Sequence, residues 1–312
     1  MSSSRAIAEP ESLDSLRPAS GEIHELFGER LRGKGVPNGM SVDVEEYFQV
    51  SAFDTIIGRE DWGTMSSRLA LAIDKILALY DEYDVKATFF TLGWIADRHP
   101  EVIKRIAREG HEIASHGHEH TRVHVLGKNK FRTDIETTRE KLEDLSGSPV
   151  IGYRAPSFSI GPNTPWAHDE LAAAGYRYSS SVFPIRHDHY GQPNAPRFAY
   201  RPTSSGVVEI PMSTLRRMGR TWPCSGGGYF RLMPLQYSKW AVSQINSKEQ
   251  LPAVFYFHPW ELDPDQPRPD GLPGKTRFRH YLNLDKFEFR LAAMLQEFAW
   301  CRMDEIYEAC VQ

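Results

Sequence analysis

Residues 115–120, SHGHEH, place three histidines at alternate positions directly after an apolar stretch. Neutral imidazole is the commonest protein ligand for transition-metal ions. On a helical turn, His116 and His120 share one side and His118 faces elsewhere. In an extended segment, all three side chains share one face. The backbone of this segment therefore decides which histidines can hold an ion together.

Residues 41–46, SVDVEE, offer two carboxylates for a third metal ligand and a general base. Because side chains alternate across a strand, Asp43 and Glu45 share one face and the two valines share the other. These acids are either an exposed pair at a turn or a buried pair with partners, since burying an unpaired carboxylate is very costly. A site with two histidines and one carboxylate leaves a position open for water, as hydrolytic zinc sites do.

Two further polar residues end apolar segments of the chain. Arg154 follows the strand-like residues 150–153 and can hold a carboxylate bidentately, which keeps that carboxylate ionised. His258 ends the apolar run AVFYFH, where a hydrogen-bonded core histidine and a functional histidine are equally good interpretations. Ligand and catalytic groups of parallel βα folds gather at the carboxyl ends of the strands.

The segments around these residues alternate between strand-like and helix-like patterns from residue 39 onward. Strands are predicted at residues 39–47, 86–93, 111–115, 150–156, 176–182, 206–212 and 252–258. Helices are predicted at residues 66–83, 100–110, 131–147, 164–175 and 234–246. Strands that alternate with helices imply parallel βα units, and this number of units favours a barrel or an open doubly wound sheet.

The composition is that of an ordinary globular protein of 312 residues, with 40% hydrophobic and 25% charged residues. A net charge of −4 gives no reason to expect nucleic acid or an anionic membrane as a partner. Three scattered cysteines without a CxxC pair predict reduced thiols. Residues 1–38 are interpreted as a flexible N-terminal arm without a signal peptide, and no stretch has the length of a membrane span. A cytoplasmic location is therefore expected.

Asp43-Val-Glu45, HGHEH, RAPS and FHPW, in that order, resemble the motifs of the metal-dependent polysaccharide deacetylases, carbohydrate esterase family four. SSVFPIRHDHYG, GGGYFRL and HPWELDPDQPR also look like the subgroup associated with exosortase-type exopolysaccharide gene clusters. The resemblance implies one catalytic domain at residues 39–312, folded as a distorted (β/α) barrel with fewer than eight strands. It also implies a divalent ion, Zn²⁺ before Co²⁺, Mn²⁺ or Ni²⁺.

The resemblance implies a role for each candidate residue. Asp43 matches the general base, Arg154 the residue that orients this base, and His258 the general acid. Ser157 matches the position whose backbone N–H supports the oxyanion. The implied metal ligands are Glu45, His116 and His120. Our candidates for contacts with sugar rings are Trp94, Tyr190 and Trp260.

Three residues depart from the family pattern. His118 stands where an aromatic residue is common, as a spectator, a substrate contact or a second metal ligand. Glu45 stands where many relatives have the shorter aspartate, and Ser179 stands where the subgroup usually has aspartate. If that aspartate positions the catalytic histidine, Glu261 or Asp263 has to do so in this chain. Separately, the glycine run at residues 224–228, CSGGG, lacks the pattern of a phosphate-binding loop and resembles a flexible lid.

The predicted reaction is the removal of acetyl groups from an N-acetylated amino-sugar polymer, or from its lipid-linked precursor, with release of acetate. A deacylase or amidohydrolase that acts on a small amide or a peptidoglycan sugar would use the same barrel and metal. A catalytically silent carbohydrate-binding barrel is the alternative from another class, and Glu45 and Ser179 are the residues that favour it.

Overall fold

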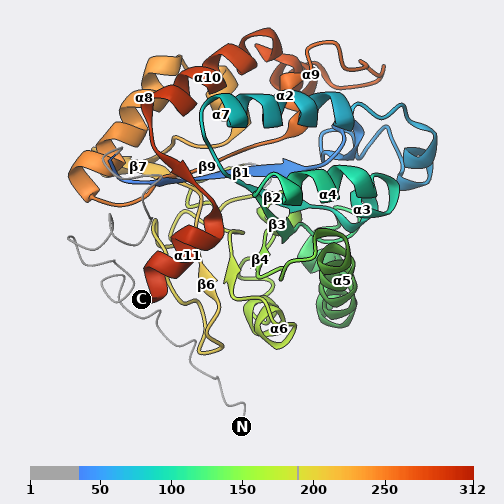
Figure 1. Cartoon of the computed structure of the whole chain (residues 1–312), viewed down its shortest axis with the longest axis horizontal. Coiled ribbons are helices and arrows are strands. Elements are labelled where there is room, and N and C mark those ends of the chain that lie inside the picture. The colour runs from blue at the N-terminus through green and yellow to red at the C-terminus, as the bar shows by residue number, and fades with distance from the viewer. Residues whose placement is uncertain (1–34, 188–189) are drawn as a thin grey trace.

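A curled sheet of parallel strands forms the centre of the computed structural model, which describes residues 35–187 and 190–312. Within these residues, seven strands in the order β9-β1-β2-β3-β4-β5-β6 make the wall of an open barrel (Figure 1). The two-residue strand β10 pairs in parallel with the start of β1. The predicted barrel with fewer than eight strands in its wall is therefore confirmed.

The strands of the sheet are short. Their bounds are β1 Asn38–Val44, β2 Thr88–Thr91, β3 Glu112–Ser115, β4 Gly152–Tyr153, β5 Tyr178–Ser179, β6 Val208–Glu209, β9 Val254–Phe257 and β10 Trp300–Cys301. An antiparallel hairpin that the sequence pattern did not predict consists of β7 Thr214–Arg217 and β8 Arg220–Pro223. Each predicted strand segment contains one strand of the barrel wall.

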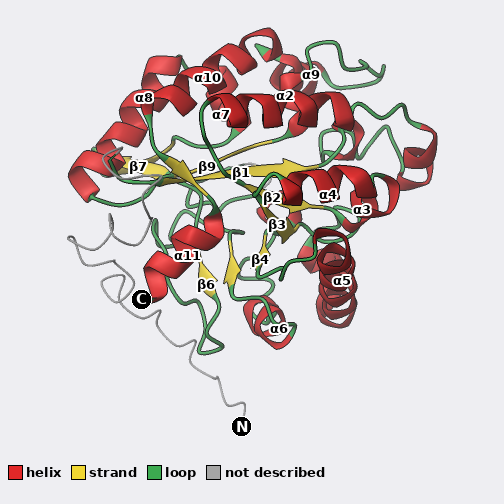
Figure 2. Ribbon diagram, in the orientation of Figure 1, coloured by secondary structure: helices red, strands yellow, loops and turns green. Residues whose placement is uncertain are grey.

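Helices cover the outside of the sheet (Figure 2). Their bounds are α2 Leu69–Glu82, α3 Gly93–Arg98, α4 Pro100–Arg108, α5 Val123–Ser146, α6 Ala167–Ala173, α7 Gly227–Leu232, α8 Leu235–Gln244, α9 Gly274–Tyr281, α10 Phe287–Glu297 and α11 Met303–Val311. None of these helices combines the length and the apolar character that crossing a bilayer requires.

The predicted N-terminal arm falls mostly outside the described residues, which begin at residue 35. Asn38, the last residue of the predicted arm, is fully buried and is the first residue of β1. Its side chain donates a hydrogen bond to the carbonyl of Ala299, and its side-chain oxygen accepts one from the N–H of Ala253. The barrel therefore begins one residue earlier than the sequence pattern indicated.

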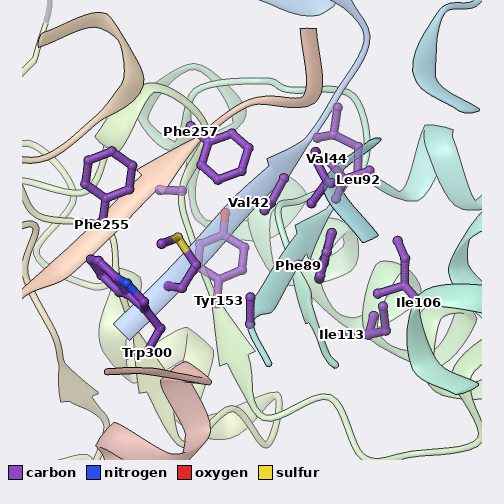
Figure 3. Packing of buried hydrophobic residues seen from close by; sticks show 14 of the residues in the cluster. Val42, Val44, Phe89, Leu92, Ile106, Ile113, Tyr153, Phe255, Phe257 and Trp300 are labelled. Atoms are coloured by element: carbon purple, nitrogen blue, oxygen red, sulfur yellow. The ribbon is translucent and has the colours of Figure 1, made fainter. Parts of the chain in front are cut away.

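The alternation of side chains along β1 separates an apolar face from a polar face. Val42 and Val44 point into the layer between sheet and helices, where they pack with Phe89, Leu92 and other apolar side chains (Figure 3). Asp43 lies on the opposite face and is also buried. The core between sheet and helices therefore fixes which way the acids of this strand point.

A buried carboxylate ties α11 to the end of the sheet where β2 and β3 begin. Glu112 accepts hydrogen bonds from the hydroxyl groups of Thr88 and Tyr178 and from the backbone N–H of Asp304. Thr88 in turn accepts a bond from the N–H of Met303. Burial, reinforced by the Asp304 carboxylate, raises the pKa of Glu112. Glu112 therefore keeps its proton in the folded protein up to a higher pH than it does in the unfolded chain.

This raised pKa predicts a stability that falls with increasing pH. Above the ordinary glutamate pKa of about 4.5, the unfolded chain loses the proton first, so each further pH unit lowers the free energy of unfolding by up to about 1.4 kcal/mol. Glu112→Gln removes this titration and will have a flatter profile. Urea unfolding of both proteins from about pH 5 to about pH 8 measures the two slopes; parallel slopes would contradict the prediction.

Candidate active site

Four candidate side chains directly follow the carboxyl ends of parallel strands. Glu45 comes after β1, His116 after β3, Arg154 after β4 and His258 after β9. Parallel strands present their carboxyl ends at one edge of a sheet, so these residues meet there. His120 joins them from the loop after β3.

Glu45, His116 and His120 form a group that can hold a metal ion. One ligand atom from each lies within 4.8 Å of the other two. Their exposed fractions are only 1%, 2% and 9%. The two histidines of the SHGHEH segment that were expected to act together are therefore brought together with the predicted carboxylate.

The turn that pairs these histidines is neither the helical turn nor the extended segment that the sequence left open. Gly117 and His120 have positive φ angles of 73° and 52°, which neither a helix nor a strand contains. The N–H of His118 is held by the Asp134 carboxylate, and its ring faces Asp97 at 3.2 Å. His118 therefore points away from the metal group and packs beside α3.

The chemistry of the donor atoms fits a divalent ion. Glu45 Oε2 is buried without a hydrogen-bond partner in the described chain, yet it lies 3.2 Å from His120 Nε2. Two ligands of a tetrahedral zinc ion lie about 3.3 Å apart, since each is about 2.0–2.1 Å from the metal. His116 Nδ1 bonds the carbonyl of Arg154 at 2.7 Å, which leaves Nε2 as the ring nitrogen that would hold an ion.

Burial changes the protonation of the three ligands. It raises the pKa of Glu45 to about 7, although His258 opposes the shift. It lowers the pKa of His116 to about 4 and that of His120 well below its usual value. The neutral imidazole is the form that binds metals. A cation between these groups would also stabilise the charge that burial disfavours on Glu45.

Arg154 holds the predicted general base. Its guanidinium is fully buried, and Nη1 donates to Asp43 Oδ1 at 2.6 Å and to Ser41 Oγ at 2.9 Å. The remaining nitrogens donate to the carbonyl and hydroxyl oxygens of Ser180. The contact with Asp43 is thus a single charge-assisted bond rather than the expected bidentate pair, because Ser180 takes the other donors.

His258 faces both the metal group and a second carboxylate. Its Nδ1 bonds Glu261 Oε1 at 2.8 Å, and its Nε2 lies 3.5 Å from Glu45 Oε1. Burial opposes the charged imidazole, but Glu45 and Glu261 outweigh it and raise the pKa of His258 to about 9. This histidine is therefore charged at neutral pH and has a proton to donate.

Glu261, rather than Ser179, contacts the candidate acid His258. Ser179 donates its hydroxyl to Ser181, at the end of β5. Asp263, the other candidate, forms an ion pair with Arg68 at 2.6 Å instead. Of the two acids that the sequence offered for this task, Glu261 contacts the histidine.

Ser157 lies in a turn with unusual backbone geometry. Its φ angle is +54°, which is uncommon for a residue other than glycine and marks strain that the surroundings maintain. Its hydroxyl lies 2.8 Å from that of Ser51. The role of its backbone N–H toward an oxyanion stays a prediction.

Two family models match adjoining parts of the chain. Residues 64–179 match the model described as polysaccharide deacetylase. This segment belongs to the polysaccharide deacetylase family. Residues 180–308 match a domain of unknown function (DUF3473).

Named relatives resemble only part of the chain. A peptidoglycan-N-acetylglucosamine deacetylase of Bacillus cereus is 37% identical over 97 residues, which are 31% of this chain and 35% of the relative. A chitooligosaccharide deacetylase of Sinorhizobium fredii is 27% identical over 146 residues, which are 46% of this chain and 60% of the relative. The match therefore spans about a third of the first relative's length and less than two thirds of the second's.

The fold as a whole resembles a solved structure. A Mycobacterium smegmatis protein classed as a polysaccharide deacetylase superposes with a TM-score of 0.58 and 18% sequence identity. The superposition covers 88% of this chain and 90% of that chain. At this identity, the comparison supports the shared fold.

The candidate site draws on more than the polysaccharide deacetylase segment. His116, His120 and Arg154 lie within residues 64–179, whereas Asp43 and Glu45 precede that segment. His258 and its partner Glu261 lie within the domain of unknown function. The deacetylase segment alone therefore holds two of the three candidate metal ligands and neither of the predicted proton-transfer residues.

The three aromatic residues expected to contact sugar have different surroundings in this deacetylase fold. Trp260 is 7% exposed, stacks with His258 and His280, and donates Nε1 to Glu45 Oε1 at 3.4 Å. Trp260 therefore packs against the metal group, and its contact with a sugar ring stays a prediction. Trp94 packs edge-on against Phe48 and Trp62, and Tyr190 stacks on His187 and Phe183. Contacts of these two with a sugar stay predictions.

The glycine run at residues 224–228 is not a lid. Four of its five residues are buried, and Gly226 has a φ angle of +90°. A Cβ atom on Gly226 would approach the Tyr256 ring to 2.6 Å, and one on Gly227 would clash with the Glu261 carboxylate. Gly226 and Gly227 are therefore required because Tyr256 and the Glu261 carboxylate pack directly against them. Sequence reasoning missed this role, and it also missed Arg231, which contacts Glu261 from the helix that follows.

Proposed function

We propose that this protein is a metal-dependent N-deacetylase that releases acetate from an N-acetylated amino-sugar polymer. One observation carries the proposal: Asp43, held by the buried Arg154, stands on the same face of β1 as Glu45 of the metal group. His258 contacts the same glutamate from β9. The relatives named as deacetylases of peptidoglycan and of chitooligosaccharides support the same chemistry.

The residues divide the hydrolysis of an amide among themselves. Glu45, His116 and His120 would hold a divalent ion, which would supply Lewis acidity toward the acetamide carbonyl and would lower the pKa of a water molecule. Asp43 accepts the proton of the attacking water, while Arg154 keeps this carboxylate in place. The Ser157 N–H meets the charge that grows on the carbonyl oxygen.

The leaving group needs the second proton-transfer residue. An amine anion is a very poor leaving group, so the C–N bond breaks only when the nitrogen receives a proton. His258 donates it from Nε2, since Nδ1 is held by Glu261. Acetate and a free amino sugar result, and the proton gained by Asp43 balances the one that His258 gives away.

The finer features of the proposal are the metal and the polymer. Zn²⁺ suits two imidazoles and one carboxylate, with Co²⁺, Mn²⁺ and Ni²⁺ as alternatives. We infer an exopolysaccharide or its lipid-linked precursor as the substrate, and peptidoglycan is the second candidate because the Bacillus cereus relative is named for it. We also infer that the enzyme acts in the cytoplasm.

Removal of the metal provides the first test. Chelator-treated protein will release acetate from an N-acetylglucosamine oligomer at less than about one hundredth of the untreated rate, because the ion supplies several kcal/mol of transition-state stabilisation. Added Zn²⁺ will restore the rate. Enzymatic quantification of acetate measures both steps, and magnesium added instead of zinc is the control.

The same assay separates the competing functions. A small-amide hydrolase will cleave the N-acetylglucosamine monomer as fast as its oligomers, whereas a polymer deacetylase will prefer the oligomers. A silent binding barrel will bind the oligomer with no acetate release at any metal concentration. That last outcome would refute the proposed function.

A further inference from the structure

Two buried side chains, Glu261 and Arg231, stand in a row behind the candidate acid His258 within the domain of unknown function. Glu261 Oε1 bonds His258 Nδ1 at 2.8 Å, and Glu261 Oε2 accepts a hydrogen bond from Arg231 Nε at 2.8 Å. Glu261 is fully buried and Arg231 is 2% exposed. Each oxygen of this one carboxylate thus has its own charged partner.

Arg231 is itself held in a single position. Its Nη1 donates to the carbonyls of Arg279, His280 and Leu282 at distances between 2.8 and 3.1 Å. Its guanidinium also lies 5.4 Å from the centre of the Trp260 ring. A guanidinium fixed by so many acceptors can define where a carboxylate sits.

The glycine turn that leads into α7 packs against another side of the Glu261 carboxylate. Gly227 lies so near Glu261 that a side chain there would clash with both carboxylate oxygens. The turn packs against Tyr256 in the same way at Gly226. The turn and Arg231 therefore confine Glu261 from two directions.

We propose that the domain of unknown function supplies the proton-donating half of the active site, and that Arg231 is a positioning residue that acts through Glu261. Arg231 holds the carboxylate so that Oε1 accepts the Nδ1 proton of His258, which leaves Nε2 as the nitrogen that delivers a proton to the amine. The inference rests on the proposed function. It assigns residues 180–308 a chemical task in place of an unknown one.

The competing explanation is that Arg231 only anchors α7 to the segment at residues 279–282. Arg290 provides a matched control, since it donates to the carbonyls of Phe230, Arg231 and Met233. It anchors the same helix, and no contact between Arg290 and Glu261 is found in the described chain. Arg290→Met therefore weakens the anchoring and spares the carboxylate.

Two substrates that differ in their leaving group test the proposal. Arg231→Met will lower the rate with an N-acetylglucosamine oligomer about 10²-fold, the lower end of a general acid's contribution. It will change the rate with 4-nitrophenyl acetate less than about threefold, because nitrophenolate leaves without a proton. Arg290→Met will leave both rates within about threefold of wild type. If Arg231→Met folds poorly, Arg231→Lys will show the same selective loss at about tenfold.

A double-variant cycle tests whether Arg231 acts through Glu261. In an enzyme that already carries Glu261→Gln, Arg231→Met will have no further effect on amide hydrolysis. Additive losses, equal losses with both substrates, or an equal loss in Arg290→Met would overturn the inference. A wild type that is inactive with the oligomer would instead refute the proposed function.

A proton NMR measurement, which needs no substrate turnover, tests the role of Arg231 even if the wild type is inactive with the oligomer. The Nδ1 proton of His258, held by a buried carboxylate, will give a low-field proton NMR signal that disappears in His258→Gln. The signal will vanish or shift in Arg231→Met and persist in Arg290→Met. An unchanged signal in Arg231→Met would overturn the positioning role.

Discussion

Asp43→Asn will lower kcat for acetate release about 10³-fold and leave the metal content unchanged. The amide has the size of the carboxylate and can keep an oxygen toward Arg154, but it cannot accept a proton from water. Asp43 is not among the three residues of the metal group, so the ion stays bound. Steady-state rates with an N-acetylglucosamine oligomer, together with elemental analysis, measure both quantities.

Asp97→Asn is the control for the removal of an acid. Asp97 lies near the same loop but pairs with His118 and Lys141 at the surface. Its replacement will leave the rate within about twofold of wild type, as expected for a surface substitution. An Asp43→Asn enzyme that keeps more than about a tenth of the activity would show that another group takes the proton.

His116→Asn will remove the metal and the activity together. The buried imidazole provides one of three donors, and the loss of the ion removes several kcal/mol of catalysis, so the rate will fall at least about 10³-fold. His120→Asn will have the same effect. Elemental analysis of protein purified without added metal will give about one ion per chain for wild type and almost none for these variants.

His118→Asn separates this site from a surface cluster of histidines. Its ring pairs with Asp97 and points away from the metal group, so the variant will keep the ion and the activity. Metal loss in His118→Asn equal to that in the other two would mean that the three histidines bind as an extended trio. The geometry of the candidate site would then be wrong.

Strand periodicity predicted the part of the site that lies on regular structure. Two valines pack against the helices and thereby force Asp43 and Glu45 to the other face, which is a consequence of the two-residue period alone. Arg154 and His258 each directly follow an apolar strand, and this position predicted that both belong to the site. Where a strand ends, its neighbours in a parallel sheet end too.

Irregular backbone, and competition among acceptors for the donors of Arg154, account for what the sequence pattern did not predict. The turn at residues 116–120 depends on left-handed angles at Gly117 and His120, which a spacing rule does not contain. The single bond from Arg154 to Asp43 follows from the competing oxygens of Ser180, which come from a distant part of the chain. The need for glycine at position 227 follows from the Glu261 carboxylate that packs against it, and this carboxylate comes from a different segment of the chain.

Strand β1 has a consequence for where this protein can be divided. It lies between β2 and β9, carries Asp43 and leads directly into Glu45, yet it precedes the segment that matches the deacetylase family. A fragment that begins at residue 64 would lack β1, the predicted base Asp43 and the predicted metal ligand Glu45. Strand β2 would then become an exposed edge, and β9 and β10 would lose the strand with which they pair, so the fragment would be prone to aggregate instead of forming a smaller enzyme.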